Sequence, residues 1–556
     1  MGLTTGLLLA PFIWVVLKSN LIVCLEWHIA PMGVSSCEII LLIDSFALYF
    51  FFTVVWISLS VLVFRLDYMK YDLFFNRFHL ILILFIFSII SLIFSPNLIR
   101  IFLGWDGLGV TSYLLVVYYN NRGSLNAGIL TFLVNRLGDA FLLRRLGAIL
   151  FLGNYSFFIF RTQFFSWVWV FPLFILASCT KSAQVPFRAW LPAAIAAPTP
   201  VSALVHSSTL VTAGIYVLIR FMISVKTGLM APIIEGLFCI GLFTTYKASL
   251  SAIIDLDIKK IVALSTLRQL GIIIISISIG QYWIRFAHLI AHANYKALWF
   301  INTGGVIHNS NRYQSFFKRS MSGGTANDSI ITTILAVMAL SGAPFIGAFY
   351  TKEPLVFIII SQPWGVVGEI VFTGGVALTV LYRFRFIVFL LSLNQSETFQ
   401  KLNLDWRGRV ARIILEGQAV VRGYLLVNSF SPKRHFFFDS RHIEILIVFT
   451  LTQFFLFRVG AIILMNYISC TQLWGLNIGW LFLFYENLFR GSRFKNYIFN
   501  FSSLSPTIVD TFRLKILRLS KGTNYKSINA YKFESIIIYQ IFASGLIIVI
   551  LFTILK

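Results

Sequence analysis

Long apolar stretches recur from one end of the chain to the other, and they constrain its fold more than any other feature. A helix that crosses a membrane needs about 20 consecutive apolar residues. The composition is 58% hydrophobic and only 12% charged, which exceeds the roughly 45–50% apolar share of a soluble domain. About fifteen stretches predict membrane-spanning helices: 3–24, 39–64, 78–95, 97–119, 126–152, 164–184, 199–224, 230–253, 258–279, 283–307, 329–357, 364–392, 443–467, 470–489 and 536–555.

The sequence therefore predicts an all-α, polytopic membrane protein built as a helical bundle. A membrane β-barrel would instead show short segments of alternating hydrophobicity. Near residue 510, apolar residues recur at helical spacing while Lys and Arg occupy other faces, which is typical of an amphipathic helix on a membrane surface. The expected segments are N-terminal membrane helices (1–96), a first half (97–253), a second half (254–392), a polar extramembrane connection with further membrane helices (393–490), an amphipathic surface helix (491–535) and a terminal span (536–556).

The net charge of +24 raises the question of nucleic-acid binding. The basic residues are scattered between apolar spans and form no nucleic-acid motif, so we expect no nucleic-acid partner. Lys and Arg in loops instead bias the orientation of membrane helices. The 5 cysteines show no C-x-x-C spacing and are expected to be small apolar side chains.

Ionisable residues interrupt many of the predicted spans. A charged side chain at the bilayer centre costs roughly 2.5–3.5 kcal/mol even on lenient scales, so it normally faces water or a partner. Their distribution over successive spans predicts a proton relay rather than isolated structural pairs. These residues are Asp44, Asp106, Asp139, Lys181, His206, Lys247, His288, His292, Lys296, Lys352 and Glu353.

Proline and glycine mark two of the same places. Pro198 and Pro200 follow Lys181, while Gly342 and Pro344 precede Lys352. Proline breaks a helix, and a broken helix at membrane depth is tolerated only where it is buried or lines a cavity. A broken helix beside a lysine in each half of the chain is typical of transporters built from repeats.

Several longer runs carry a family resemblance. They resemble the antiporter-like, proton-pumping subunits of respiratory complex I, and among these the subunit 5 type of mitochondrial NADH dehydrogenase (ubiquinone). The run from Ala197 to Thr209, APTPVSALVHSST, is the most specific for this group. The matching runs are Gly104–Gly109, Asn135–Asp139, Lys181–Gln184, Ala197–Thr209, Asp257–Thr266, His288–Lys296, Ile307–Asn309 and Gly347–Glu353.

The resemblance implies a role for each matching ionisable residue. Asp106 would pair with Lys181, and Asp139 would modulate that pair. His206 and Lys259 would join the inner part of the proton path, and His288, His292 and Lys296 would form its central relay. Lys352 would be the exit lysine on the second broken helix, with Glu353 beside it. The surface helix at 491–535 would correspond to the family's lateral helix.

The resemblance also implies the setting. The chain would be a multi-pass protein of the mitochondrial inner membrane, and its partners would be lipid and other complex I membrane subunits, especially the neighbouring antiporter-like subunit. It would bind no cofactor and no metal itself, while NADH, FMN, iron–sulfur clusters and ubiquinone would act elsewhere in the complex. The alternative from the same superfamily is a subunit of a free-standing multisubunit Na⁺/H⁺ antiporter.

A relay without its own redox centre is physically feasible. Burial lowers the pKa of a lysine, and a nearby carboxylate raises it. A proton-motive force of about 200 mV corresponds to about 4.6 kcal/mol per charge. A change in pKa of about 3.4 between two conformations therefore suffices, and burial with charge pairing supplies changes of that size.

Two histidines allow a second interpretation, as ligands of a metal or haem. His288 and His292 lie one helical turn apart and could bind a metal or haem. The chain lacks the paired histidines on two helices that haem bundles carry, and Lys296 on the same face would repel a cation. An oxidase subunit is therefore disfavoured.

Some arginines depart from the family pattern. Arg144, Arg145, Arg188 and Arg268 fall where such subunits usually carry small polar or apolar residues. One explanation is extra charge that faces water or partner chains. The other is an animal mitochondrial gene translated with the wrong code, in which AGA and AGG codons for serine are written as arginine. In the same way, AUA codons for methionine would be written as isoleucine, which fits the small number of Met residues, 8 in all.

Overall fold

The computed structural model describes residues 22–32, 35–150, 167–224, 231–280, 282–309, 314–315, 327–342, 346–360, 365–392 and 406–430. All of them belong to one compact unit formed by residues 1–461 and 551–556. Most of the predicted span at 3–24 lies outside the described residues. So do the spans at 443–467, 470–489 and 536–555, the lateral helix at 491–535, and Pro344.

The chain enters the described region through an antiparallel hairpin, which corrects the all-α prediction. Strand β1 (Val23–Met32) pairs with β2 (Ser35–Ile43), with Val23 opposite Ile43 and a register shift between His28 and Ala30. We had predicted a helical span from residue 39. That start is wrong because a short apolar run does not by itself distinguish a strand from a helix. Asp44 ends β2 and caps the following helix by accepting from Ala47 N at 2.9 Å.

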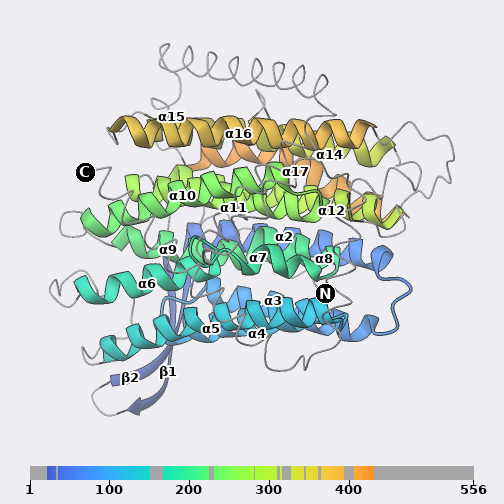
Figure 1. Cartoon of the computed structure of the whole chain (residues 1–556). Coiled ribbons are helices and arrows are strands. Elements are labelled where there is room, and N and C mark those ends of the chain that lie inside the picture. Colours follow the sequence, from blue (N-terminus) through green and yellow to red (C-terminus); the bar gives the residue numbers. More distant parts are fainter. Residues whose placement is uncertain are drawn as a thin grey trace, which may run out of the picture. The chain divides into compact units, whose positions relative to one another are not determined.

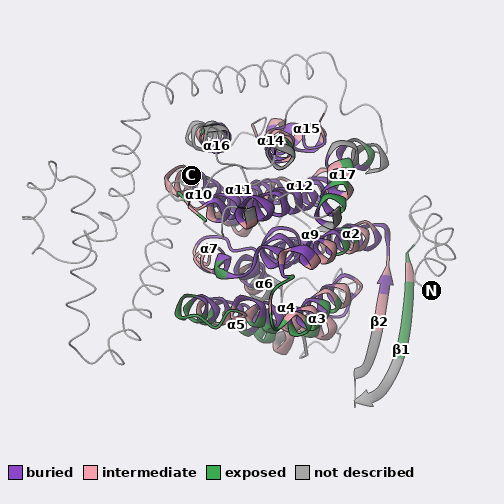
Figure 2. Ribbon diagram, turned by 90° about the vertical axis from the view of Figure 1, so that its right-hand side faces the viewer, coloured by how far each residue is buried: buried purple, intermediate pink, exposed green. Residues whose placement is uncertain are grey.

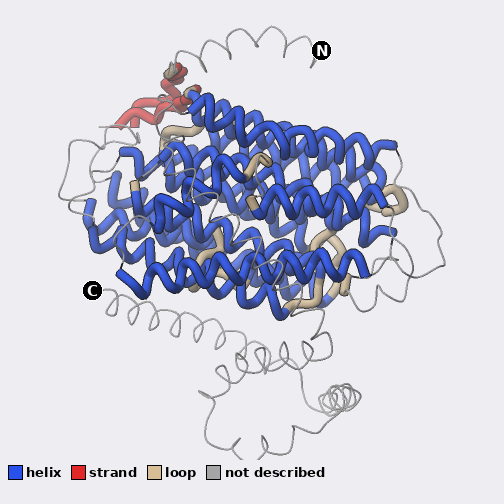
Figure 3. The backbone as a smooth tube through the Cα atoms, turned by 90° about the horizontal axis from the view of Figure 1, so that it is seen from above, coloured by secondary structure: helices blue, strands red, loops and turns tan. Residues whose placement is uncertain are grey.

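Helices form the rest of the described chain (Figures 1 and 3). The hydrogen bonds within each helix satisfy the backbone internally, as a lipid environment requires, and the apolar side chains suit that environment. The first group comprises α2 (Ser45–Tyr68), α3 (Phe75–Ile93), α4 (Leu98–Val116), α5 (Arg122–Leu150), α6 (Trp167–Lys181), α7 (Trp190–Ala193), η2 (Ala194–Ala196), α8 (Thr199–Val201), η3 (Ser202–Thr209) and α9 (Leu210–Ser224). The second comprises α10 (Ala231–Ile254), α11 (Ile258–Ile279), α12 (Tyr282–Asn309), α14 (Asn327–Ser341), α15 (Phe349–Ile360), α16 (Gly365–Ser392) and α17 (Trp406–Phe430).

Six helices within the described residues are long and apolar enough to cross a membrane: Ser45–Tyr68, Phe75–Ile93, Leu98–Val116, Thr199–Met222, Pro232–Ile254 and Ile258–Ile279. They differ in burial (Figure 2). The most apolar part of Thr199–Met222 is fully buried, whereas that of Phe75–Ile93 is only 44% buried. An apolar face left uncovered in this way is suited to lipid.

Helix α12 lies at the centre of the unit. It packs against α2, α11, α14, α17 and η3. Helix α17 lies in the segment 393–490, for which the sequence predicts a polar connection with further membrane helices, and it packs on α12 and α2. Ala411, Leu415 and Ala419 form a buried stripe at intervals of one turn, and Arg412 beside them is buried as well.

Two helices are interrupted. Helix α6 ends at Lys181, and the chain passes through α7 and η2 before Ala197 and Pro198 adopt extended backbone angles. The helix that resumes at Thr199 contains the π-helical segment η3, and such segments are frequent at functional sites. The second interruption follows Ser341, where Gly342 has a φ of 84° before α15 begins at Phe349.

Candidate functional site

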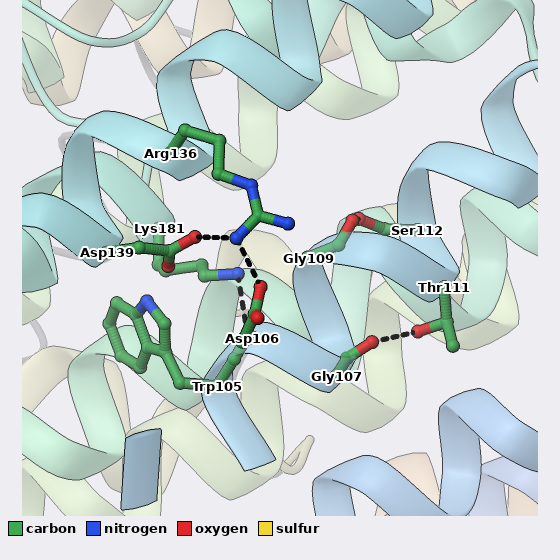
Figure 4. Close-up of polar contacts among 9 residues, drawn as sticks. All are labelled: Trp105, Asp106, Gly107, Gly109, Thr111, Ser112, Arg136, Asp139 and Lys181. Atoms are coloured by element: carbon green, nitrogen blue, oxygen red, sulfur yellow. Dashed lines mark hydrogen bonds and ion pairs between the residues drawn. The ribbon is translucent and has the colours of Figure 1, made fainter. Parts of the chain in front are cut away.

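Lys181 ends helix α6 inside the bundle. Its side chain is completely buried, and Nζ donates to the backbone oxygen of Trp105 at 3.2 Å (Figure 4). The indole ring of Trp105 lies 5.3 Å from Nζ. A Cβ at Gly109 would lie 3.3 Å from Nζ, so glycine leaves room for the ammonium group. The C-terminus of a helix favours a cation, which suits a lysine at this position.

Arg136 occupies the place that we had expected Lys181 to take beside Asp106. Its Nη1 lies 2.9 Å from Asp106 Oδ1 and 3.3 Å from Asp139 Oδ2, so it bridges both carboxylates (Figure 4). Within the described residues, Lys181 forms no direct ion pair with either acid. Asp106 therefore bonds to Arg136 and not directly to Lys181, with which it interacts electrostatically. The pairing of Asp106 with Lys181 in proton transfer stays a prediction.

The break before α8 frees a backbone carbonyl. Lys259, at the start of α11, donates from Nζ to Ala197 O at 3.2 Å. His206 lies on η3, is buried, and has its ring 6.1 Å from the ring of Trp190. Both predicted residues therefore line the interrupted segment, as expected where a cation can stabilise unpaired backbone oxygens.

Lys296 sits in the middle of α12, completely buried. Its Nζ donates to the hydroxyl of Ser265 and lies 3.5 Å from Val262 O, both on α11. The ring of Trp299 is 4.5 Å from Nζ. The ammonium group thus has neutral polar partners and an aromatic face, but no carboxylate partner among the described residues.

One turn apart on the same helix, His292 and His288 continue the line toward α15. Their ring centres are 6.4 Å apart. His288 Nδ1 lies 3.1 Å from the hydroxyl of Thr351 on α15. Thr351 therefore connects the central helix with the second interrupted helix.

Lys352 and Glu353 begin α15 with both side chains buried. Lys352 Nζ donates to Ser341 O at 2.6 Å and lies 3.5 Å from Glu353 Oε1. A Cβ at Gly342 would lie 2.6 Å from Glu353 Oε1. The glycine therefore provides both the left-handed turn and the space that the carboxylate occupies.

Buried amides accompany these groups. Gln269, Asn294 and Asn302 are at most 1% exposed, and neither amide atom of any of them has a hydrogen-bond partner among the described residues. Buried polar groups are nearly always satisfied by protein or water. Gln269 lies on α11 and Asn294 and Asn302 lie on α12, the two helices that also carry Ser265 and Lys296.

Asp44, by contrast, belongs to a structural contact. Both of its carboxylate oxygens accept from the Arg220 guanidinium, and the arginine also contacts the hydroxyl of Tyr216. Tyr216 in turn donates to Ile93 O at 3.1 Å. The ends of α2, α3 and α9 are joined in this way. Lys247 lies over the ring of Phe243 at 4.5 Å.

The predicted residues fall into separate groups around Lys181, the break at Ala197, Lys296 with the two histidines, and Lys352. Among the described residues, the hydrogen bond that links two of these groups is the one between His288 and Thr351, the neighbour of Lys352 in the chain. Proton transfer between the groups requires water or side-chain movement. Across the described ranges, no cluster of three or more His, Cys, Asp or Glu side chains could hold a metal ion.

Sequence reasoning missed four of the contacts. It did not assign roles to Arg136, Ser265, Ser341 or Thr351. Arg136, Ser265 and Thr351 lie within runs that carry the family resemblance, and Thr351 directly precedes Lys352. Ser265 and Ser341 act through distant contacts, which spacing along the sequence does not reveal.

Comparisons with known proteins identify the family and the fold. The family described as "NADH:quinone oxidoreductase/Mrp antiporter, TM" matches residues 95–379. Two solved structures share the fold: the Mrp complex from Dietzia sp. (TM-score 0.66, 20% identity, 97% of this chain and 59% of that chain) and the membrane-bound sulfane sulfur reductase, an archaeal respiratory complex (TM-score 0.67, 18% identity, 76% and 88%). The chain belongs to this antiporter-like membrane family.

Its relatives within the family are more specific. NADH-ubiquinone oxidoreductase chain 5 of Aedes aegypti is 40% identical over 420 residues, which cover 74% of this chain and 71% of that protein. The protein of the same name from Lumbricus terrestris is 38% identical over 432 residues, 76% and 73% of the two chains. The resemblance to the subunit 5 type is confirmed.

Proposed function

We propose that this chain is a membrane subunit of NADH:ubiquinone oxidoreductase that carries protons across the mitochondrial inner membrane. NADH oxidation and quinone reduction in other subunits drive it. Its partners are the other membrane subunits of the complex, in particular a neighbouring antiporter-like subunit. The proton path uses Lys181, His206, Lys259, the His288–His292–Lys296 line and Lys352 with Glu353.

The observation that carries this proposal is the arrangement around Lys181. Among the described residues, the fully buried Lys181 bonds directly to a backbone carbonyl and faces an aromatic ring, and it interacts electrostatically with Asp106 and Asp139, which Arg136 bridges. Arg136 and Lys181 can therefore compete for Asp106. When Asp106 turns toward Lys181 the charged ammonium is stabilised, and when it returns to Arg136 the lysine releases its proton.

The test is a Lys181→Ala complex, or its counterpart in a tractable homologue, reconstituted in vesicles. We expect NADH-driven proton pumping and turnover to fall together by at least roughly tenfold, because the chain loses a proton-transfer group. Assembly is checked on a native gel. Lys260→Ala is the matched control, since Lys260 is partly exposed and pairs with Asp257 at 2.7 Å. Wild-type pumping by an assembled Lys181→Ala complex would show that Lys181 is only structural.

The alternative is a subunit of a free-standing Na⁺/H⁺ antiporter, and the shared fold with an Mrp complex is the observation that favours it. The same vesicles separate the two. We expect proton uptake or release that requires NADH and quinone and continues without Na⁺. Proton movement that follows an imposed Na⁺ gradient in the absence of NADH would support the antiporter instead.

A further inference from the structure

Thr351 is the one side chain that directly connects a relay histidine with the helix carrying Lys352 among the described residues. Its hydroxyl is buried and lies 3.1 Å from His288 Nδ1. Lys352 is the next residue in the chain, and its Nζ has Ser341 O and Glu353 as partners. Among the described residues, Nδ1 of His288 bonds only to Thr351, and Nε2 has no hydrogen-bond partner.

The geometry points to Thr351 as a proton-carrying residue between His288 and the Lys352–Glu353 pair, an inference that rests on the proposed function. A hydroxyl is both donor and acceptor. It can accept the Nδ1 proton of a charged His288 ring while its own proton passes to an adjacent water and on to neutral Lys352. One N–H and two O–H bonds break, two O–H and one N–H bond form, and His288 ends neutral while Lys352 ends charged and the threonine and the water are unchanged.

Thr351 also has the features of a structural pin, meaning a side chain that only holds α12 and α15 together. The test must separate that role from proton transfer. Its hydroxyl lies 3.4 Å from Ala348 O, at the limit of a weak bond. A pin depends on the shape of the side chain and on one hydrogen bond. A proton carrier depends on the exchangeable hydroxyl proton.

The experiment compares Thr351→Val, which keeps the shape and removes the hydroxyl, with Thr351→Ser, which keeps the hydroxyl. Both are measured in the intact complex for assembly, NADH-driven pumping and the effect of D₂O on the pumping rate. We expect Val to assemble and lose pumping by roughly tenfold or more, and Ser to retain pumping with a solvent isotope effect. Wild-type pumping by Val, or equal loss in Val and Ser, overturns the inference.

The Lys181→Ala complex distinguishes this failure from failure of the proposed function. If Lys181→Ala loses pumping and Thr351→Val does not, only the role of Thr351 is wrong. If neither variant loses pumping, the proposed function fails with it. Should Thr351→Val fail to assemble, Thr351→Ser still decides, because retained pumping with no solvent isotope effect overturns proton transfer through the hydroxyl.

A different observation concerns three buried arginines. Arg268, Arg285 and Arg383 are at most 2% exposed. Nε and Nη1 of Arg268 and all three guanidinium nitrogens of the other two have no hydrogen-bond partner among the described residues. Arg136 and Arg220, in contrast, are paired with carboxylates. Arg285 and Arg383 lie over the rings of Tyr282 and Tyr382 at 4.8 and 5.7 Å, but an aromatic face does not replace hydrogen-bond acceptors. A buried guanidinium without such acceptors is strongly destabilising, so three in one bundle are not sustainable.

Two of these arginines also add positive charge near the ionisable residues of the proposed proton path. Arg268 and Arg383 interact electrostatically with Lys296, Lys352 and Glu353. That region would hold four cations and a single carboxylate inside the membrane. A lysine that must take up a proton could not function beside such an excess of positive charge.

The structure assigns serine, not arginine, to positions 268, 285 and 383 of the natural polypeptide, through AGA or AGG codons read by an animal mitochondrial code. A buried helical serine satisfies its own hydroxyl through a carbonyl one turn back. Ser265 and Ser276 on α11 do so, each at 2.6 Å from the carbonyl oxygen of the residue three positions earlier. Position 268 on the same helix has the same backbone available.

Mass spectrometry of peptides from the native subunit, digested with chymotrypsin, tests this assignment together with the gene sequence. We expect serine at the three positions and AGA or AGG codons there. Arg136 and Arg220 serve as controls and should remain arginine with CGN codons. Peptides that carry arginine at 268, 285 or 383 overturn the assignment at that position, and CGN codons do the same.

Discussion

Gly342 shows how a single residue determines the geometry of the second lysine site. Its φ of 84° lies in the left-handed region, and a Cβ there would approach Glu353 Oε1 to 2.6 Å. From the sequence, the residues Gly342, Lys352 and Glu353 could be singled out as a broken helix beside buried charges. The hydrogen bond from Lys352 to Ser341 O could not be predicted, because it joins two helices across a turn.

Gly342→Ala should therefore destabilise the complex and weaken pumping. The left-handed backbone costs an alanine about 1–2 kcal/mol, and displacement of the carboxylate adds about 1–3 kcal/mol. The thermal midpoint of the assembled complex, followed on native gels, measures the loss, and vesicle pumping measures the effect on Lys352.

Gly280→Ala provides the matched control. Gly280 caps α11 with a φ of 99°, yet a Cβ there meets nothing within 4 Å. It should show the backbone cost alone, with pumping unchanged. Equal effects in the two variants would mean that the space beside Glu353 is unimportant.

At the scale of elements, ion pairs and interruptions have distinct roles. Asp44 was predicted as one of the intramembrane ionisable residues of a relay, but the structure pairs it with Arg220 at the ends of α2 and α9. Pro198 and Gly342 were predicted to interrupt helices, and the structure places an interruption at each. From the sequence, an ionisable residue in a span can belong to a proton path or can form an ion pair with a residue at the end of another helix. The sequence does not distinguish the two, because either arrangement satisfies the charge.

The Asp44–Arg220 pair should be important for stability. Asp44→Asn leaves a largely buried guanidinium unpaired and should lower stability by about 3 kcal/mol, as should Arg220→Gln. The double variant should lose less than the sum, because neither charge is then left alone. The thermal midpoint of the assembled complex is the measurement.

Asp257→Asn is the control for that series. It breaks the Asp257–Lys260 pair, whose side chains are 34% and 43% exposed, and such surface pairs contribute at most about 1 kcal/mol. Additive losses in the Asp44 and Arg220 variants would show that the two residues do not stabilise each other.

For the whole molecule, composition predicted a polytopic helical membrane protein correctly, while the details depend on packing. Six described helices can span a membrane, and the fold is that of the antiporter-like family. The start of the second predicted span is a strand, and α17 packs on α12 although its sequence is basic. The lateral helix and the terminal span remain predictions, as does the total of about fifteen spans.

The sequence by itself determined the solvent, the helical class and the family, and it singled out ionisable residues of which Lys181, Lys296 and Lys352 are buried in the structure. These follow from local composition and from runs of consecutive residues, because a lipid interior imposes its requirements on each helix separately. Only the tertiary structure decided the partners. Arg136 rather than Lys181 holds Asp106, Ser265 holds Lys296, and Thr351 reaches His288. Such contacts depend on how helices distant in sequence pack and rotate against one another, which residue spacing within one helix does not specify.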